Sequence, residues 1–149
     1  GLSIGVGMAL AMRLDNIKSK VFVLMGDGEM QEGSVWEALM NANNQKLKNL
    51  VVIIDKNNLQ IDGPTNDVKS LEPLDKKLEA FGFNVKTVDG HNYEELEKVL
   101  LDAKKSNELT AIIANTIKGK GVSFMENNVS WHGKAPNDDE LKKALEELC

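Results

Sequence analysis

Hydrophobic and polar residues alternate in blocks along the chain, and this pattern predicts strands separated by helices. The stretch KVFVLMGDG, residues 20–28, is a branched apolar run that stops at glycine, as a buried strand does where it leaves a sheet. The stretch LVVII, residues 50–54, is apolar throughout, which is typical of a parallel strand covered on both faces. Two further strands are expected at residues 84–88 and 110–115.

Helical segments lie between and around these strands. Residues 2–12 combine large apolar side chains with glycine and alanine, so we expect a buried helix that approaches another backbone closely. The spacing of Ser34 and Glu37 fits a capping box that opens a helix over residues 35–45. Three more helices are expected, at residues 73–81 before Gly82, at residues 93–105 after Asn92, and at residues 138–148.

The alternation of strands and helices predicts an α/β fold, with a parallel sheet and helices on both faces. At 149 residues the chain is expected to form a single domain, residues 1–149, with its own core. The polar segment at residues 116–137 contains glycines, Trp131 and His132, and it is long for a connection. Because long loops inside compact domains are often functional, we expect a functional role for this segment.

Composition narrows the classes of partner. The net charge of -5, with no block of clustered Lys or Arg in the sequence, argues against nucleic acid and anionic membrane surfaces. The longest apolar run, residues 2–12, is too short to cross a bilayer and lacks the charged lead of a signal peptide, so we expect no membrane partner and a cytoplasmic protein. Cys149 is the only cysteine, which excludes an intrachain disulfide and fits a reducing compartment.

Two polar residues, Asp27 and Asn57, follow the first two predicted strands. Because parallel sheets bind ligands outside the carboxyl ends of their strands, we expect both residues at a ligand site. A carboxylate, an amide oxygen and a nearby backbone carbonyl form an all-oxygen set that suits Mg²⁺, with water and phosphate as its other ligands. Gly26 and Gly28 flank the aspartate and let backbone N–H groups reach a phosphate. The pattern indicates a metal-bound diphosphate, while GDG alone also fits a tight turn and the paired asparagines alone a polar loop.

Three motifs carry a family resemblance: GDGEMQEGSVWEA, NNLQIDGPT and KGKGVSFMENNVSWHGKAPN. A GDG turn followed, after the next strand, by paired asparagines resembles the thiamine diphosphate fingerprint. The longer motifs resemble the N-terminal subunit of the split bacterial and archaeal transketolases, over almost the whole chain. The resemblance implies the thiamine diphosphate-binding fold. It also implies a G-x-L-G-Q-G stretch that ends at Gly1, so the domain is expected to be truncated at its N-terminus.

The resemblance further implies a cofactor site for thiamine diphosphate with Mg²⁺, or with Ca²⁺ or Mn²⁺ in its place. The metal ligands that it implies are the side chains of Asp27 and Asn57 and the backbone carbonyl of Leu59. The residues that it implies for cofactor binding are Gly26, Asp27, Gly28, Glu29, Asn57, Leu59 and His132.

Two residues are candidates for catalysis through the same resemblance. Glu32 matches a glutamate at a subunit interface that helps to link two cofactor sites, and His132 matches a histidine near the diphosphate and the substrate entrance. The alternative for Glu32 is an acid in the first turn of a helix, where the helix dipole favours it. The alternative for His132 is an exposed loop histidine.

The activity that the resemblance implies is that of a transketolase-type transferase, which moves a two-carbon ketol unit from a ketose phosphate to an aldose phosphate. The implied partner is a C-terminal transketolase subunit that carries the pyrimidine-binding domain, in a heterotetramer or other oligomer, and without it the chain is expected to be inactive. The alternatives are another thiamine diphosphate enzyme, such as a deoxyxylulose-phosphate synthase or a keto-acid dehydrogenase component, and a non-catalytic truncated subunit.

The remaining notable residues have plainer interpretations. His91 is expected to serve in a turn or cap and to lie outside the site. Lys118 and Lys120 could meet phosphate, although loop lysines are usually only solvated. Packing in the core or at an interface is expected for Trp36 and for Met8, Met12, Met25, Met30 and Met40. The apolar helix at residues 2–12 and the helix after Ser34 are the surfaces expected to be covered by association.

Overall fold

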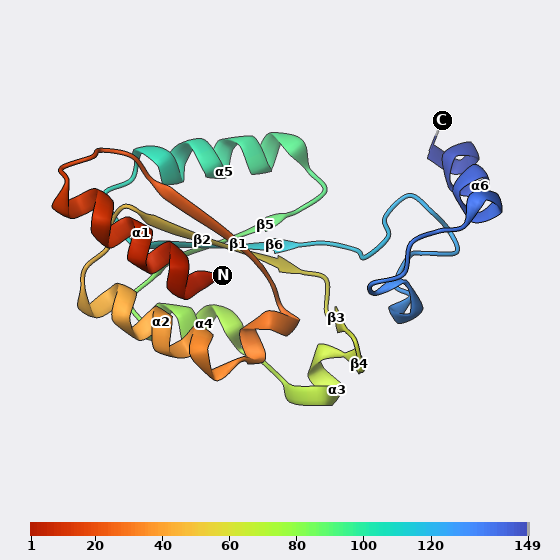
Figure 1. The fold of residues 1–149 in the computed structure, drawn as a ribbon, viewed down its shortest axis with the longest axis horizontal. Coiled ribbons are helices and arrows are strands. Elements are labelled where there is room, and N and C mark those ends of the chain that lie inside the picture. Colours follow the sequence, from red (N-terminus) through yellow and green to blue (C-terminus); the bar gives the residue numbers. More distant parts are fainter. Residues whose placement is uncertain (149) are drawn as a thin grey trace.

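The computed structural model describes residues 1–148. Four strands form one parallel sheet in the order β1-β2-β6-β5, and two shorter strands form a separate hairpin (Figure 1). The elements are α1 (Leu2–Leu14), β1 (Val21–Gly26), η1 (Gly28–Gln31), α2 (Gly33–Asn44), β2 (Leu50–Lys56), β3 (Leu59–Gln60), β4 (Gly63–Pro64), α3 (Thr65–Lys69), α4 (Leu74–Ala80), β5 (Asn84–Asp89), α5 (Tyr93–Lys105), β6 (Thr110–Asn115), η2 (Val129–Trp131) and α6 (Asp138–Leu148).

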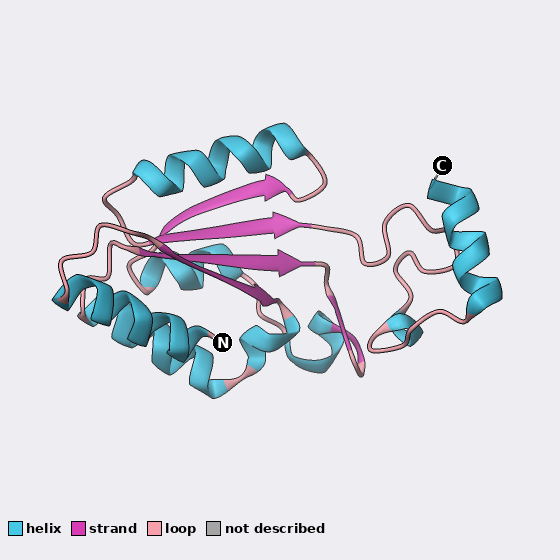
Figure 2. Cartoon of the chain, turned by 45° about the horizontal axis from the view of Figure 1, so that its top comes forward, coloured by secondary structure: helices cyan, strands magenta, loops and turns pink. Residues whose placement is uncertain are grey.

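The strands of the main sheet run in one direction and end almost together. Gly26 of β1 lies opposite Asp55 of β2, and Lys56 lies opposite Asn115 of β6. Figure 2 shows the four arrows pointing to the same side of the molecule. We call that side the carboxyl end of the sheet and the opposite side the amino end.

Helices cover both faces of the sheet, as the sequence predicts. On one face α1, α2 and α4 pack against β2 side chains such as Val52 and Ile54, which are fully buried. On the other face α5 covers the sheet through Val99 and Ala103, which pack against Val51. Figure 1 shows this three-layer arrangement, with α5 alone on its side. The uninterrupted apolar run of β2 therefore reflects burial on both faces.

Most of the predicted elements are confirmed within a few residues. The helix expected after Asn92 begins at Tyr93, because the Asn92 side chain accepts hydrogen bonds from the N–H groups of Glu94 and Glu95 at 3.1 and 3.2 Å. The helix expected before Gly82 ends at Ala80, and Gly82 adopts a φ of 82°, which glycine reaches without strain. The strand at 110–115 and the helix at 138–148 have the predicted bounds.

The capping box predicted from Ser34 and Glu37 is wrong. The helix α2 starts at Gly33, and its N-cap is Glu32, with no side-chain capping bond. The reason lies in the preceding turn: η1 ends at Gln31, and Glu32 is extended with φ -71° and ψ 130°, so the helix begins before Ser34. Ser34 is thus already inside the first turn, where it cannot act as the cap.

The first helix is only half buried, which corrects the prediction of a buried helix at residues 2–12. One face of α1 packs against the core through Val6 and Ala9, while Ile4 is 70% exposed and Met8 49%. Gly5 permits close packing, since a Cβ there would lie 2.3 Å from the Val23 side chain. The association predicted for this face stays a prediction. No helix within residues 1–148 is long and apolar enough to cross a membrane.

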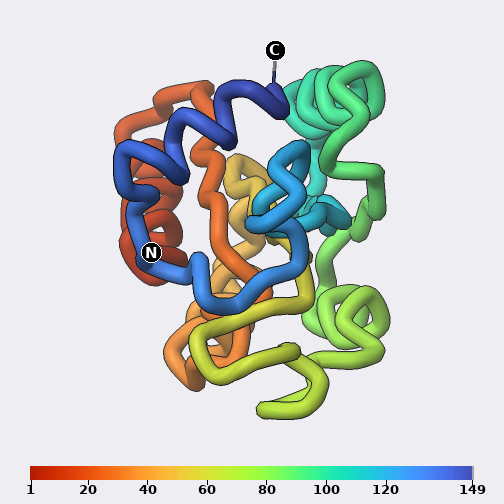
Figure 3. Tube along the Cα trace, turned by 90° about the vertical axis from the view of Figure 1, so that its right-hand side faces the viewer, coloured from red at the N-terminus to blue at the C-terminus, as the bar shows by residue number. Residues whose placement is uncertain are grey.

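The hairpin β3–β4 and the short helix α3 have no counterpart in the sequence prediction, because two-residue strands give no readable periodicity. The end of the chain also has more structure than a plain polar loop. Residues 116–148 leave β6 and lie beyond the carboxyl end of the sheet, as Figures 1 and 3 show. This segment contains η2 and α6, and the Ser123 hydroxyl donates to Glu147 at 2.8 Å, which joins the loop to α6.

Candidate functional site

A cavity of about 420 Å³ opens at the carboxyl end of the sheet. The strand ends, the β3–β4 hairpin and the segment 116–137 all contribute to its wall. The lining residues are Gly26, Asp27, Gly28, Glu29, Glu32, Asn57, Leu59, Gln60, Ile61, Lys118 and His132. Every site residue expected from the sequence is therefore brought to one cavity.

Asp27 is the most constrained polar residue of this cavity, with 1% of its surface exposed. One carboxylate oxygen accepts the N–H of Gly28 at 2.9 Å, and the other accepts the N–H of Asn58 at 2.7 Å. Its own N–H donates to the carbonyl of Asp55 at 3.1 Å. These bonds tie the end of β1 to the turn after β2, so the carboxylate has a fixed position.

The charge of Asp27 has no counterpart in the described part of the protein. Within residues 1–148, no Lys, Arg or His nitrogen lies within 4.0 Å of its carboxylate. Burial raises the pKa of Asp27 above its ordinary value, and the nearby Asp55 carboxylate adds to the rise. The N–H groups of Asn58 and Gly28 lower the pKa and oppose that effect. A buried acid beside a second carboxylate is an arrangement that a bound cation would stabilise.

Asn57 lines the same cavity as Asp27 and lies just before the β3–β4 hairpin. Its side-chain oxygen accepts the N–H of Leu59 at 3.0 Å, and Asn58 between them has a φ of 61°. This tight turn lets the N–H of Asn58 reach Asp27 while Asn57 and Leu59 face the cavity. Asparagine tolerates such a left-handed conformation better than most residues, which explains a second asparagine at this place.

A pair of glutamines holds the hairpin against the turn after β1. The side chain of Gln60 donates to that of Gln31 at 3.1 Å, and Gln31 in turn donates to the carbonyls of Thr65 at 3.2 Å and Lys69 at 2.7 Å. The turn η1, which follows Asp27, is thus joined to the hairpin and to α3.

The two glycines beside Asp27 have different surroundings. A Cβ at Gly28 would lie 3.0 Å from the Cβ of Gln60, so only glycine lets the hairpin approach this closely. A Cβ at Gly26 would meet no atom within 4 Å. Because Gly26 lines the cavity, its missing side chain leaves space for a ligand rather than for packing.

Glu32 and His132 both line the cavity and are exposed at its mouth. Glu32 is the N-cap of α2. His132 ends η2, and its N–H donates to the carbonyl of Val129 at 2.8 Å. The preceding Trp131 anchors this turn, since its ring nitrogen donates to the carbonyl of Phe124 at 3.0 Å and its ring packs on that of Phe124. The imidazole itself therefore reaches the cavity from an ordered support.

His91 lies outside this cavity, as predicted. Its N–H donates to Asp89 at 2.9 Å, as in a turn, and its ring nitrogen Nε2 accepts the N–H of Ile117 at 2.7 Å. The sequence does not predict this second bond. It fixes the start of the segment that carries His132, so His91 supports the site from a distance.

Three lining residues are not assigned to the site by the sequence: Gln60, Ile61 and Lys118. The two hairpin residues carry no chemical signal of their own, and only the unpredicted hairpin brings them to the wall. The sequence treats Lys118 and Lys120 alike as candidates for phosphate contact. The structure separates the two lysines, because Lys118 lines the cavity whereas Lys120 lies 3.9 Å from Glu126.

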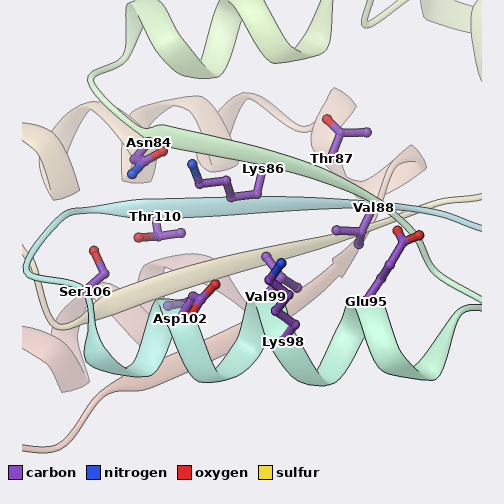
Figure 4. A pocket seen from close by; sticks show the side chains of 11 residues that line it. Asn84, Lys86, Thr87, Val88, Glu95, Lys98, Val99, Asp102, Ser106 and Thr110 are labelled. Carbon is purple, nitrogen blue, oxygen red and sulfur yellow. The ribbon is translucent and has the colours of Figure 1, made fainter.

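A cavity of similar volume, about 480 Å³, lies between β5 and α5, and none of its lining residues lines the carboxyl-end cavity (Figure 4). Its charged lining is balanced, with Lys86 and Lys98 accompanied by Glu95 and Asp102. It contains none of the residues expected from the motifs. The carboxyl-end cavity is therefore the better candidate for the functional site.

Comparison with known proteins supports the choice of the carboxyl-end cavity as the functional site. Residues 1–149 match the family described as "Transketolase, thiamine diphosphate binding domain". The chain belongs to this transketolase family. The resemblance seen in the sequence is thus confirmed, and a thiamine diphosphate-binding domain accounts for a cavity built around a GDG turn.

Individual transketolases match nearly the whole chain. It is 45% identical over 148 residues to a subunit of the apulose-4-phosphate transketolase of Actinobacillus succinogenes, and the match covers 99% of this chain and 54% of that protein. A 6-deoxy-6-sulfo-D-fructose transketolase subunit of a Clostridium species is 41% identical over 149 residues, with 99% and 54% covered. The chain thus spans about half the length of these curated relatives.

A solved structure confirms the fold. A crystal structure of a transketolase from Campylobacter jejuni matches with a TM-score of 0.89 and 38% identity, over 99% of this chain and 24% of that one. The parallel sheet with helices on both faces is therefore the transketolase arrangement for this part of the molecule.

The residues present fit a metal-bound diphosphate in their chemistry. Within residues 1–148, no group of three or more His, Cys, Asp or Glu side chains could hold a metal ion. A cation at Asp27 would need neutral oxygens as further ligands, such as those of Asn57 and Leu59, together with water and phosphate. Hard cations such as Mg²⁺ are commonly held by few carboxylates and completed by phosphate oxygens.

Proposed function

We propose that this chain forms the diphosphate-binding half of a transketolase site and acts in the transfer of a two-carbon ketol unit from a ketose phosphate to an aldose phosphate. The observation that carries the proposal is the buried carboxylate of Asp27, fixed by two backbone N–H groups and without a cationic partner in the described chain. A metal ion bound to a diphosphate supplies the missing positive charge. The family match supports the identity of that diphosphate as thiamine diphosphate.

Eight of the eleven lining residues receive a role under this proposal. Asp27, Asn57 and the carbonyl of Leu59 hold Mg²⁺, and Gly26 and Gly28 leave room for the diphosphate beside the strand ends. When bound, thiamine diphosphate supplies the carbanion chemistry that breaks and forms the carbon–carbon bond. The protein positions the cofactor and stabilises its charge.

The two candidates at the mouth act on the substrate side. His132 is exposed on an anchored turn, where its imidazole can exchange a proton with a substrate hydroxyl or carbonyl oxygen. Glu32 lies on the same rim, and we propose that it faces a second chain. Lys118 is the one lysine of residues 1–148 that lines this cavity, and it is placed to contribute charge toward a phosphate.

We further propose that a second subunit with a pyrimidine-binding domain completes the site. The names of the two relatives above describe subunits, and Glu32 lines a cavity whose mouth remains open in this chain. Those names also state different sugars, apulose 4-phosphate and 6-deoxy-6-sulfo-D-fructose. The donor sugar for this protein therefore needs a direct assay.

Two measurements test the proposal. Calorimetric titration with thiamine diphosphate should show binding that depends on Mg²⁺ and is abolished by EDTA. Ketol transfer from a panel of ketose phosphates to aldose phosphates should then be assayed with and without the partner subunit. Binding without transfer under any combination would support the non-catalytic alternative. Absence of Mg²⁺-dependent binding in the assembled protein would overturn the cofactor assignment itself.

A further inference from the structure

A second cavity of about 420 Å³ lies at the amino end of the sheet, opposite the candidate site. The turns that lead into β1, β2 and β6 form it, together with the last turns of α1 and α5. Within residues 1–148, its lining holds six cationic side chains and no Asp or Glu, although the chain as a whole has a net charge of -5. We call it the amino-end cavity, and its cationic residues are Arg13, Lys18, Lys20, Lys46, Lys48 and Lys104.

None of these six charges is neutralised within the described part of the chain. No carboxylate of residues 1–148 lies within 4.0 Å of any of them. Arg13 donates to the backbone carbonyl and the side chain of Gln45, and Lys20 donates to two backbone carbonyls. These acceptors are neutral, so they orient the cations and leave the positive charge in place. No sequence pattern indicates this cluster, because its members are spread from residue 13 to residue 104.

Hydrogen bonds join the segments that line the cavity. The ammonium of Lys20 joins two of the turns, at 2.7 Å from the carbonyl of Lys48 and 2.5 Å from that of Ser106. The side chain of Asn49 donates to the carbonyl of Ala9 at 2.9 Å, which ties the turn before β2 to α1. Burial lowers the pKa of Lys20, as expected for a cation held inside the rim.

Another lysine-lined cavity shows an arrangement in which acids accompany the lysines. Between β5 and α5, Lys86 and Lys98 share the lining with Glu95 and Asp102 (Figure 4). At the amino end, by contrast, Asp15 and Glu108 do not line the cavity, and Glu108 lines an adjoining cavity together with Lys46 and Lys48. The carbonyl ends of helices favour single cations nearby, but this preference does not require them to converge on one cavity.

We propose that the amino-end cavity binds a small polyanion that carries several phosphate groups. Several lysines and an arginine around one concavity match closely spaced phosphate oxygens, which ammonium and guanidinium groups bind by charge-assisted hydrogen bonds. Among the described residues, no aromatic side chain lines the cavity for base stacking, and the negative net charge opposes a long nucleic acid. The side chains of Ser19 and Asn107 add neutral donors to the lining.

The probe for the test is inorganic tripolyphosphate, added to the purified protein at low ionic strength. Lysine acetylation, read peptide by peptide with mass spectrometry, reports which ammonium groups the probe covers. We expect protection of Lys18, Lys46, Lys48 and Lys104, and none of Lys86 and Lys98. Protection should fade as NaCl is raised, because salt screens exposed charges. Protection of Lys118 instead of the four amino-end lysines would assign the probe to the carboxyl-end site and overturn the proposal.

Matched variants give an independent measure. Lys18→Gln with Lys48→Gln removes two exposed charges whose ammonium groups make no hydrogen bond within residues 1–148, and should weaken tripolyphosphate binding at least tenfold by calorimetry. Lys86→Gln with Lys98→Gln changes the net charge equally and should leave the affinity within twofold. Equal losses in the two double variants would show a general charge effect and contradict a site.

A third arm distinguishes the class of anion. A hexaglutamate peptide at the same concentration should protect the four amino-end lysines less than tripolyphosphate does. A peptide that protects them more strongly would mark the cavity as a protein contact and overturn the phosphate assignment. Melting temperatures of both double variants, expected to equal that of the wild type, verify that binding is compared between folded proteins.

Discussion

The cavities at the two ends of the sheet have the same volume, about 420 Å³, and opposite charge. At the carboxyl end, Asp27, Glu29 and Glu32 face one lysine, Lys118, and one histidine. At the amino end, six cations face no acid among the residues that the structure describes. The direction of the chain favours this difference without fully accounting for it. Helices that connect parallel strands run back along the sheet, so their N-termini lie at its carboxyl end and their C-termini at its amino end (Figure 1).

Backbone groups hold the charged side chains at both ends of the sheet. Asp27 is held by backbone N–H groups, whereas Lys20 and Arg13 are held by backbone carbonyls. Helix C-termini favour cations, and helix N-termini favour anions such as a diphosphate. One topology therefore prepares two unlike binding surfaces. The predictions below alter one end at a time, beginning with the change of largest expected effect.

Asp27→Ala should weaken Mg²⁺-dependent binding of thiamine diphosphate by about 2–5 kcal/mol, because it removes a buried charged partner of the metal. Asn57→Ala removes only a neutral ligand and should cost about 1 kcal/mol. Calorimetric titration of the assembled protein measures both. An unchanged affinity for Asp27→Ala would contradict the metal site, and Lys18→Gln at the amino end serves as the control that should bind normally.

His132→Ala should lower the rate of ketol transfer by about 100-fold, the scale of a lost general acid or base. Its effect on the melting temperature should be small, because the side chain is exposed and buries little apolar surface. Steady-state kinetics and thermal unfolding test the two parts separately. A large drop in melting temperature with a normal rate would identify a structural histidine.

The two glycines beside Asp27 should respond differently to alanine. Gly28→Ala places a Cβ 3.0 Å from that of Gln60 and should cost about 1–3 kcal/mol of unfolding free energy, as overpacking does. Gly26→Ala meets no neighbour within 4 Å and should retain stability while reducing cofactor affinity. Chemical denaturation and calorimetry on both variants decide the point, and equal losses of stability would refute the distinction.

The pKa of Asp27 gives the metal-free protein a pH dependence with a definite sign. At pH values below about 3.9, the ordinary pKa of aspartate in an unfolded chain, Asp27 is protonated in both the folded and the unfolded state. Its carboxyl group then does not lower the free energy of unfolding. As pH rises from there through the raised folded pKa, ionisation of the buried carboxyl lowers stability. In EDTA, the difference in unfolding free energy between wild type and Asp27→Asn should fall over this window by about 1.4 kcal/mol per unit of pKa rise. Parallel pH profiles would contradict this sign.

The smallest effect is expected at the amino end. Lys18→Gln with Lys48→Gln should change the free energy of unfolding by no more than about 0.5 kcal/mol, as is usual for exposed positions. Any gain in stability from reduced repulsion between the lysines should disappear in high salt. Denaturation at two NaCl concentrations measures it. A large loss of stability would show that these lysines hold the turns together, as Lys20 does.

The sequence predicts the sheet better than the turns around it. Long apolar runs such as residues 50–54 and a strong cap such as Asn92 determine their elements locally, and both predictions are confirmed. The start of α2 depends on η1, and no hydrophobic periodicity in the sequence predicts η1. Ser34 therefore has the spacing of an N-cap but does not act as one. The hairpin at residues 59–64 is held by Gln31 and other distant contacts. For the same reason the sequence assigns no role to Gln60 and Ile61, although both lie within the motif NNLQIDGPT, because only the folded hairpin brings them to the cavity.

The amino-end cavity cannot be predicted from the sequence at all. Its cations come from two helix ends and two turns that only the folded sheet brings together, and each lysine alone looks like an ordinary solvated residue. The carboxyl-end cavity is equally distributed along the chain, but its motifs make it recognisable. Composition reports the sum of the charges, and the sum of -5 conceals their separation.

The bond between Asp27 and the N–H of Asn58 joins residues that are far apart in the chain and meet only when β1 pairs with β2. An unfolded chain therefore cannot form the half-site, and a ligand that binds there binds the native state alone. Such selective binding adds about 2.7 kcal/mol of stability when free ligand is about 100 times its Kd. Under the proposed function, thiamine diphosphate also protects the chain from unfolding, and protein made while the cofactor is scarce would reach proteases more often than protein made with cofactor at hand.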